Sequence, residues 1–424
     1  MDSFDYREGN LYCEDVLLES LAEKYGTPLY VYSKSTLLDH YNKIKQAFAE
    51  VEPVICFAVK ANGNLSVLRA LSEAGAGFDL VSGGELFRVS RAGGDTSRAV
   101  FAGVGKTGKE LDDALAADIL LFNCESVPEL DAIQEAARRA GKKARVALRL
   151  NPDVKAGGHR KISTGHKETK FGLPPAAASK ILAVAGKWPD VIFDGIHLHI
   201  GSQITSPEPY VAALDRAVAF IKANRSEAAP LTWLDSGGGF GVFYKADDRA
   251  SGAEDFAAAI LPRVKDAACR LILEPGRFVV ANAGVLVARI LYVKDTASKR
   301  YYIVDAGMND LVRPAMYDAF HEIWPAESHL LPPSRGGSVE GATLCVADVV
   351  GPICETGDVL ASGRALPEMA AGELVSIFSA GAYGFTMASN YNARPRPAEV
   401  LVDGEQVTLA RKRETYEDLI RGEE

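Results

Sequence analysis

Short apolar runs alternate with amphipathic segments along the first two thirds of the chain. From about residue 30 to 275, eight runs are rich in β-branched and apolar residues and have the length of buried strands. They cover residues 53–59, 78–81, 98–103, 118–123, 144–150, 193–200, 231–236 and 269–274. Between them, apolar residues recur at spacings of three and four, which favours helices. This alternation predicts parallel strands with right-handed crossovers, and eight such units fit a (β/α)8 barrel of the TIM type.

The pattern changes after about residue 276. Five later segments are strand-like and have no regular helices between them: 285–293, 300–307, 342–351, 372–379 and 398–412. The pair Asp403–Gly404 lies between two such runs and is typical of a hairpin turn. We therefore expect an α/β protein of two domains. A barrel would span residues 30–276, and a mainly antiparallel β domain would span residues 277–424 together with residues 1–29.

Composition restricts the class of protein. The chain has 424 residues and a formal net charge of −9, which argues against nucleic acid or an anionic membrane surface as a partner. No apolar run approaches the roughly 18 residues of a membrane span, and the acidic, polar N-terminus lacks a signal-peptide pattern. The six cysteines include no CxxC pair, so we expect free thiols. These features predict a cytoplasmic globular protein.

One connection differs from the others. Residues 153–173, which begin DVKAGGHRK, are rich in glycine and basic residues and show no periodicity. The segment is long for a connection between a strand and a helix. A solvated excursion and a mobile lid are both compatible with this pattern.

Reactive side chains fall at the ends of the predicted strands. Lys60 ends the first strand, Asp79 lies in the second, His199 ends the sixth and Glu274 ends the eighth. Singly, such residues are usually solvated or structural. In a barrel, however, catalytic groups gather at the carboxyl ends of the strands. A base, two acids and an imidazole on one rim therefore indicate an enzyme.

A glycine run after the seventh strand suggests a phosphate site. It does not fit the dinucleotide fingerprint GxGxxG, because position 242 is Val242, and the chain has no Walker-type loop. Backbone N–H groups around Gly238 and Gly239 could still enclose a phosphate, at a position common for phosphate sites in barrels. Ser202 and Arg277 could add hydroxyl and guanidinium donors.

An anchored phosphate and a lysine at a strand end together suggest pyridoxal 5′-phosphate. The aldehyde of this cofactor forms a Schiff base with a lysine, here Lys60. Glu274 would then face the pyridine nitrogen and keep it protonated, which makes the ring a better electron sink. His199 would lie flat against the ring.

Eight motifs make the chain resemble a known family. The chain is similar to the diaminopimelate decarboxylases, which are pyridoxal-phosphate decarboxylases of fold type III in the alanine-racemase-like group that also holds ornithine decarboxylase. The resemblance runs from about residue 25 to 415, with the motifs in family order. They are FAVKAN (57–62), FDLVSGGEL (78–86), HIGSQI (199–204), DSGGGFG (235–241), EPGRFVV (274–280), DAGMNDLVRPAMY (305–317), GPICETGD (351–358) and GAYGFTMASNYNARPRPAEVLV (381–402).

The resemblance implies a reaction and a set of site residues. The reaction is decarboxylation of meso-2,6-diaminopimelate to L-lysine and CO2, the last step of lysine biosynthesis. The cofactor would be held by Lys60, Asp79, His199, Ser202, Gly238, Gly239, Glu274, Gly276, Arg277 and Tyr383. The amino-acid substrate would be held by Arg277, Arg313, Tyr317, Glu355 and Tyr383. Lys60, His199, Glu274 and Cys354 would be catalytic, and Cys354 would come from the second subunit of a homodimer with shared active sites.

Several alternatives remain open. Decarboxylases of ornithine or arginine act on substrates that end in a cation, whereas Arg313 and Tyr317 favour a distal carboxylate. A racemase on the same fold fits Glu274 less well, and a non-enzymatic cofactor carrier would not need Cys354. A metal-dependent hydrolase could use His197 with His199, which are two residues apart on one strand. No other histidine lies at a strand end, so we expect no metal.

Overall fold

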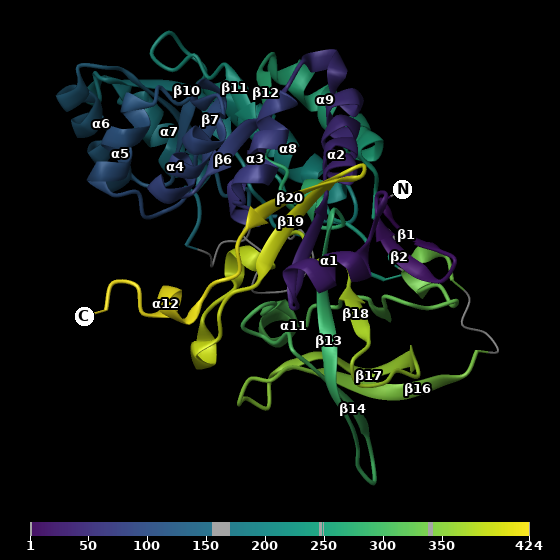
Figure 1. Cartoon of the computed structure of the whole chain (residues 1–424). Helices are drawn as coiled ribbons and strands as arrows, with labels where there is room; N and C mark the ends of the chain where they lie inside the picture. Colours follow the sequence, from purple (N-terminus) through teal and green to yellow (C-terminus); the bar gives the residue numbers. More distant parts are fainter. Residues whose placement is uncertain (1, 155–169, 246–247, 249, 338–341, 424) are drawn as a thin grey trace. The chain divides into compact units, whose positions relative to one another are not determined.

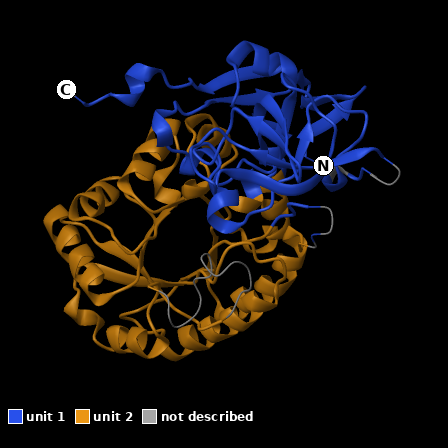
Figure 2. Ribbon diagram, turned by 90° about the horizontal axis from the view of Figure 1, so that it is seen from below, with its two compact units in different colours: residues 1–39, 242–249, 279–424 blue, residues 40–241, 250–278 orange. Residues whose placement is uncertain are grey.

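The chain forms two compact units in the computed structural model, which describes residues 2–154, 170–245, 248, 250–337 and 342–423. The barrel unit comprises residues 40–241 and 250–278, and the sheet unit comprises residues 1–39, 242–249 and 279–424 (Figure 2). Tyr244, which falls within the expected barrel segment, thus belongs to the sheet unit. Most of the 153–173 connection, and with it the question of a lid, lies outside the described residues.

Eight parallel strands close the barrel unit. Their order around the barrel is β5-β6-β7-β8-β9-β10-β11-β12, and β12 pairs with β5. Each strand coincides with one of the eight predicted runs, so the (β/α)8 prediction is confirmed. The strands are β5 (Val54–Ala58), β6 (Gly77–Leu80), β7 (Ala99–Phe101), β8 (Leu121–Cys124), β9 (Ala144–Arg149), β10 (Val191–His197), β11 (Trp233–Asp235) and β12 (Arg270–Leu273).

Helices form an outer ring around these strands (Figure 2). Local signals set their ends: α6 begins after Ser126, whose hydroxyl accepts from the Glu129 amide, and ends at Gly141 with a φ of 63°. The helices after β5 are α3 (Leu65–Glu73), α4 (Gly83–Ala92), α5 (Gly108–Ala116), α6 (Val127–Ala140), α7 (Pro175–Ala183), α8 (Glu208–Asn224) and α9 (Ala253–Ala267). Before β5 lies α2 (Lys34–Ala47), and α10 (Arg277–Val280) follows β12.

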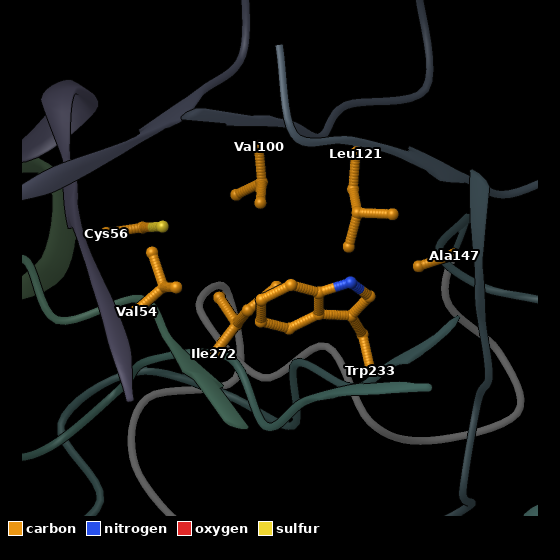
Figure 3. Packing of buried hydrophobic residues seen from close by; sticks show 7 residues of the cluster. All are labelled: Val54, Cys56, Val100, Leu121, Ala147, Trp233 and Ile272. Carbon is orange, nitrogen blue, oxygen red and sulfur yellow. The ribbon is translucent and has the colours of Figure 1, made fainter. Parts of the chain in front are cut away.

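A layer of apolar side chains fills the inside of the barrel. Trp233 is its largest member, and its ring reaches across the space between the other six (Figure 3). Gly195 makes room for it, because a Cβ there would lie 3.0 Å from the Cβ of Trp233. The layer consists of Val54, Cys56, Val100, Leu121, Ala147, Trp233 and Ile272.

The next inward-facing position on these strands is polar. Side chains two residues apart on a strand share a face, so the apolar Leu121, Trp233 and Ile272 are followed on the same face by Asn123, Asp235 and Glu274. In the same way, Gly195 is followed by His197. The packing of the apolar layer therefore fixes the positions from which a second, polar layer is built.

The sheet unit is mainly antiparallel. Its large sheet runs β17-β16-β14-β13-β4-β19-β20, with β18 pairing with both β13 and β15 (Figure 1). Only β14–β16 and β19–β4 are parallel pairs among the strands described in this sheet. The strands are β4 (Leu29–Ser33), β13 (Gly284–Asp295), β14 (Arg300–Val304), β15 (Ile323–Pro325), β16 (Leu344–Val350), β17 (Val359–Pro367), β18 (Leu374–Ile377), β19 (Ala398–Asp403) and β20 (Gln406–Arg411).

The expected β-rich second part is thus confirmed as a fold class, with differences in detail. The 403–404 hairpin is present, but Asp403 pairs with Gln406, so Gly404 and Glu405 form its loop and Gly404 adopts a φ of 62°. A small separate sheet holds β1 (Phe4–Arg7), β2 (Asn10–Cys13) and β3 (Val16–Leu17). The sheet unit also contains α1 (Leu18–Tyr25), α11 (Arg313–Tyr317) and α12 (Tyr416–Leu419).

Among the helices that the structure describes, none combines the length and apolar character needed to cross a bilayer.

Replacing Trp233 by alanine should destabilise the barrel. Trp233 is 2% exposed, and its removal leaves a cavity in the layer on which the polar residues rest. We expect the free energy of unfolding to fall by about 3–5 kcal/mol, measured by urea denaturation. Phe87→Ala on α4 is the control, because Phe87 is 61% exposed, and its loss should stay below about 1 kcal/mol. Equal losses in the two variants would contradict this account of the core.

Candidate active site

The polar layer of the barrel lies at the carboxyl ends of the strands. Asp79, Asn123, His197 and Asp235 are fully buried, and Glu274 is 3% exposed. Carboxylates are rarely buried without partners, so three in one layer require specific compensation. The three carboxyls differ in their hydrogen-bond partners and in their pKa.

Lys60 is brought to this layer by a turn directly after β5. Residues Val59–Ala61 form a 3-10 turn, and the Lys60 ammonium makes an ion pair with Asp79 on the neighbouring strand. The second oxygen of Asp79, Oδ1, is buried and has no hydrogen-bond partner in the described part of the chain. Burial, together with the nearby Glu274, raises the pKa of Asp79 to about 7 despite the Lys60 charge. Asp79 can therefore gain or lose a proton near neutral pH.

Glu274 holds the negative charge of the layer. Burial alone would raise its pKa, but the hydrogen bond from His197 and the charge of Lys60 outweigh burial and keep the pKa of Glu274 well below its usual range. Asn123 Nδ2 donates to Glu274 Oε1 at 3.1 Å, and His197 Nε2 lies 3.3 Å from Oε2. Because burial lowers the pKa of His197, the imidazole is neutral and donates through Nε2–H.

Asp235 completes the surroundings of Glu274. Its oxygens accept from the Gly237 amide at 3.0 Å and from Asn123 Nδ2 at 3.3 Å. Burial, followed by the charge of Glu274, raises the pKa of Asp235 well above its usual range. Two adjacent buried carboxyls cannot both ionise at low cost. The layer therefore carries its charge on Glu274 and a proton on Asp235.

His199 lies just beyond β10 and remains neutral. Burial and the Arg149 charge lower its pKa to about 3. Its Nδ1 accepts from the Gly238 amide at 3.4 Å and lies 3.9 Å from Glu274. The predicted neighbourhood of His199, Gly238 and Glu274 is thus present.

The glycine run is required by close approach of three loops. A Cβ on Gly237 would lie 2.3 Å from the Leu198 carbonyl oxygen, one on Gly238 would lie 1.8 Å from that of Glu274, and one on Gly239 would lie 2.2 Å from that of Gly201. Gly237 and Gly239 also have φ angles of 71° and 107°, which favour glycine. These positions leave backbone rather than side chains around the loop, as a phosphate cradle requires.

Two further predicted groups meet beside the glycine run. Arg277 Nη2 donates to Ser202 Oγ at 3.0 Å, so a guanidinium and a hydroxyl from different loops lie together. Gly276 precedes Arg277 in a tight contact with Ala58 and Ala61, where a Cβ would lie 3.0 Å from either methyl group.

The barrel residues fit a pyridoxal phosphate. The site offers a primary amine on Lys60, an ionised acid at Glu274 and an anion-binding set at Arg277, Ser202 and the glycine backbone. These are the three attachments that this cofactor needs, at its aldehyde, its ring nitrogen and its phosphate. The unsatisfied Oδ1 of Asp79 is a further buried acceptor in the same layer.

The remaining predicted residues lie in the sheet unit. Arg313 is the first residue of α11 and is 6% exposed, while Tyr317 follows one turn later on the same helix and is half-buried. Tyr383 is half-buried with a φ of 56°, a backbone conformation that costs a non-glycine residue energy.

Cys354 and Glu355 lie on an exposed turn. Asp358 holds this turn by accepting from the amides of Met308 and Ile353, at 2.6 and 2.7 Å. The Cys354 amide donates to Asn392 Oδ1 at 3.0 Å, and the Tyr391 hydroxyl donates to Glu355.

Sequence reasoning did not identify several residues that contact the predicted site residues, among them Asn123, Asp235, Tyr391, Asn392, Tyr244 and His321. Asn123 and Asp235 could have been found from their position two residues after an apolar core residue. Asn392 and Tyr391 give no comparable local signal. The other two, Tyr244 and His321, contact Arg313.

Comparisons with known proteins agree with this geometry. A sequence family described as "Pyridoxal-dependent decarboxylase, pyridoxal binding domain" matches residues 34–281. The chain is 45% identical to a diaminopimelate decarboxylase of Aquifex aeolicus over 98% of this chain and 96% of the relative. It is 46% identical to that of Pseudomonas aeruginosa over 100% and 99%.

Solved structures give the same result. Diaminopimelate decarboxylase from Helicobacter pylori, complexed with L-lysine, superposes with a TM-score of 0.88 at 38% identity, covering 95% of this chain and 98% of that one. The enzyme from M. jannaschii in complex with L-lysine gives a TM-score of 0.92 at 37% identity, covering 100% and 98%. With this identity over nearly its full length, the chain belongs to the diaminopimelate decarboxylase family of pyridoxal-phosphate-dependent enzymes.

Proposed function

We propose that this chain converts meso-2,6-diaminopimelate to L-lysine and CO2 with pyridoxal 5′-phosphate, the last step of lysine biosynthesis. The observation that carries this proposal is the buried Glu274, which accepts from Asn123 and His197 in the layer that Lys60 reaches through its ion pair with Asp79. An acid that stays ionised can hold a proton on the ring nitrogen of the cofactor. A carboxy-lyase needs that arrangement more than a racemase does, because it must stabilise the electron pair left by CO2.

The barrel residues divide the work at the cofactor. When bound, pyridoxal phosphate supplies an electron sink for the pair of electrons released at the substrate α-carbon. Lys60 would hold the aldehyde, and Asp79, with its pKa near 7, could accept a proton that Lys60 releases. The neutral His199 would face the ring without adding charge. Arg277, Ser202, Tyr383 and the backbone of Gly238 and Gly239 would bind the phosphate, and Gly276 allows Arg277 its position.

The sheet-unit residues select the substrate. Diaminopimelate carries a carboxylate and an ammonium at its far end. Arg313 and Tyr317, together with Arg277 of the barrel unit, would bind the carboxylate, and Glu355 would accept from the ammonium. Tyr383 would contact both substrate and cofactor. A substrate of the ornithine or arginine type ends in a cation, which the buried Arg313 would repel.

Cys354 supplies the proton that replaces CO2, and we propose that it acts across a homodimer with shared active sites. Its support is the position of Cys354 and Glu355 on an exposed turn rather than in the core. A thiol carries a proton and can act as a general acid.

We assign cofactor binding to residues 30–276 and completion of the site to residues 277–424 with residues 1–29. A cytoplasmic location is supported by the net charge of −9 and by six cysteines that form no disulfide.

A metal-dependent hydrolase is the alternative from another class. Nitrogen or oxygen atoms of His197, Asp235 and Glu274 all lie within 4.8 Å of one another, which differs from the His197–His199 pair suggested by the sequence. A metal there would occupy the carboxylate that the cofactor needs. Stoichiometric zinc in purified active protein would favour this alternative.

Lys60→Ala should abolish both the colour and the activity of the enzyme. We expect the purified wild-type protein with pyridoxal phosphate to release CO2 and L-lysine from meso-diaminopimelate faster than it releases CO2 from ornithine or arginine. Its visible absorbance from lysine-bound cofactor should be missing in Lys60→Ala. Faster turnover of ornithine would contradict the substrate, and a colourless wild-type protein would contradict the cofactor.

Glu274→Gln should lower turnover strongly while the cofactor still binds. The amide keeps the shape of Glu274 but removes its charge and replaces one acceptor oxygen with an NH2 donor, so we expect kcat to fall by about 10²–10³-fold. Asp235→Asn is the matched control, because the Asp235 carboxyl already carries a proton and its replacement changes no charge. Its kcat should change by less than about tenfold. Similar losses in both variants, measured by release of CO2, would argue against the assignment of charge to Glu274.

Mixing two inactive variants tests the shared site. A heterodimer of Lys60→Ala and Cys354→Ala subunits would contain one intact site, formed by Lys60 of one chain and Cys354 of the other. Random reassortment should restore about a quarter of the wild-type activity. No recovery after verified subunit exchange would show that each chain supplies both residues to its own site.

A further inference from the structure

Arg313 and His321 form a buried pair in the sheet unit. Arg313 Nη1 lies 3.0 Å from His321 Nε2, and His321 is fully buried. The other ring nitrogen, Nδ1, lies 2.9 Å from the carbonyl oxygen of Phe378. The imidazole is therefore placed between a donor and an acceptor.

These two contacts fix the protonation of the ring. A carbonyl oxygen only accepts hydrogen bonds, so Nδ1 carries the hydrogen. A guanidinium only donates, so Nε2 presents its lone pair to Arg313. A doubly protonated ring would point an N–H at the guanidinium. His321 thus serves as a neutral acceptor for a cation.

Strand pairing holds His321 in place. The helix α11 ends at Tyr317, and the next residue, Asp318, has a φ of 51° and turns the chain back. Ile323 of β15 pairs with Ile377 of β18, and the Phe378 amide donates to the Glu322 carbonyl oxygen at 2.8 Å. His321 is therefore attached to the sheet beside the carbonyl that its own ring contacts.

Tyr244 limits the guanidinium on another side. Its ring centroid lies 5.0 Å from Cζ of Arg313, within the range of a cation–π contact. The same ring packs edge-on against His321, at a centroid distance of 5.5 Å and an angle of 79°. An imidazole nitrogen and an aromatic ring, both uncharged, thus orient a cation that is 6% exposed.

We propose that His321 is a positioning residue that aims Arg313 at the far carboxylate of the substrate. The proposal rests on the function proposed above, in which Arg313 binds that carboxylate. A neutral acceptor takes one of the five N–H groups of the guanidinium and fixes its direction without cancelling its charge. An acidic residue in the same place would form an ion pair and compete with the substrate carboxylate.

Two ligands that differ by this carboxylate provide the test. L-Lysine retains the far carboxylate of diaminopimelate, whereas cadaverine has the same chain of two amines without it. Both are titrated into purified holoenzyme, and binding is followed by the visible absorbance of the cofactor. The quantity compared is the ratio of the dissociation constant of cadaverine to that of L-lysine.

Two variants distinguish the roles of the two ring nitrogens of His321. In His321→Gln, the side-chain amide reaches the position of Nε2 and retains an acceptor for Arg313. In His321→Asn, the shorter amide reaches only Nδ1 and retains the bond to Phe378. We expect the ratio to fall about ten- to a hundredfold in His321→Asn, as for a lost hydrogen bond to a charged group. In His321→Gln it should stay within about threefold of the wild type.

His321→Glu tests the need for a neutral acceptor. It has nearly the shape of the glutamine variant, but its carboxylate would pair with Arg313. We expect a ratio well below that of His321→Gln, with L-lysine weakened and cadaverine little changed.

The outcomes distinguish this inference from the function on which it rests. If the wild type turns over diaminopimelate and prefers L-lysine, an unchanged ratio in His321→Asn overturns the role of His321. An equal fall in His321→Gln and His321→Asn overturns it too. A wild type that does not distinguish the ligands contradicts the role of Arg313 itself. If His321→Asn does not fold, the test uses the other two variants. An equal ratio of the cadaverine and L-lysine dissociation constants in His321→Gln and His321→Glu would then overturn the proposal.

Discussion

The arrangement of the barrel site depends on keeping one buried carboxylate ionised. Asp79, Asp235 and Glu274 all lie inside the barrel, where burial favours their neutral forms. The structure concentrates the charge on Glu274, because His197 and Asn123 donate to it and Lys60 lies close enough to lower its pKa. Asp235 gives up its charge as a consequence, and Asp79 titrates near pH 7 beside Lys60. The three carboxyls therefore take three different states beside the Lys60 amine. Glu274 is ionised, Asp235 is protonated, and Asp79 can exchange a proton near neutral pH.

The fold produces this arrangement through the two-residue period of its strands. The apolar layer around Trp233 sets the spacing and the direction of each strand, and the following inward position is polar on β8, on β11 and directly after β12. A strand slipped by one residue would turn Asn123, Asp235 and Glu274 outward. Stability and chemistry are therefore fixed by the same register, with apolar side chains at one level and polar side chains at the next.

Sequence reasoning predicts the barrel well because its signal is local. Each of the eight strands is a short apolar run, and Lys60, Asp79, His199 and Glu274 could be placed at their ends from position alone. The layer partners Asn123 and Asp235 were missed, since an amide and an acid beside an acid look like ordinary polar residues until the strands are closed. For the sheet unit, the strands were predictable but the side-chain contacts were not.

His321 shows why those contacts escape a linear reading. It lies eight residues after Arg313, but its ring is fixed by Phe378, which is 57 residues further along the chain. Tyr244 reaches the same guanidinium from a segment that the sequence pattern assigned to the barrel. Tyr391 and Asn392 meet Glu355 and Cys354 from more than 30 residues away. No period or spacing along the chain encodes such pairs.

The two buried charges nevertheless follow one physical rule. Glu274 contacts the neutral His197 and Asn123 and the protonated Asp235, while Arg313 contacts the neutral His321 and the ring of Tyr244. In both cases hydrogen bonds or π-contacts from uncharged groups help to orient the ion. A buried ion pair would satisfy either charge and leave little of its field for a ligand. Neutral partners do not cancel the charge of the buried ion, so its electrostatic field can act on a ligand. Glu274 can then stabilise a cationic ring nitrogen, and Arg313 can bind a carboxylate.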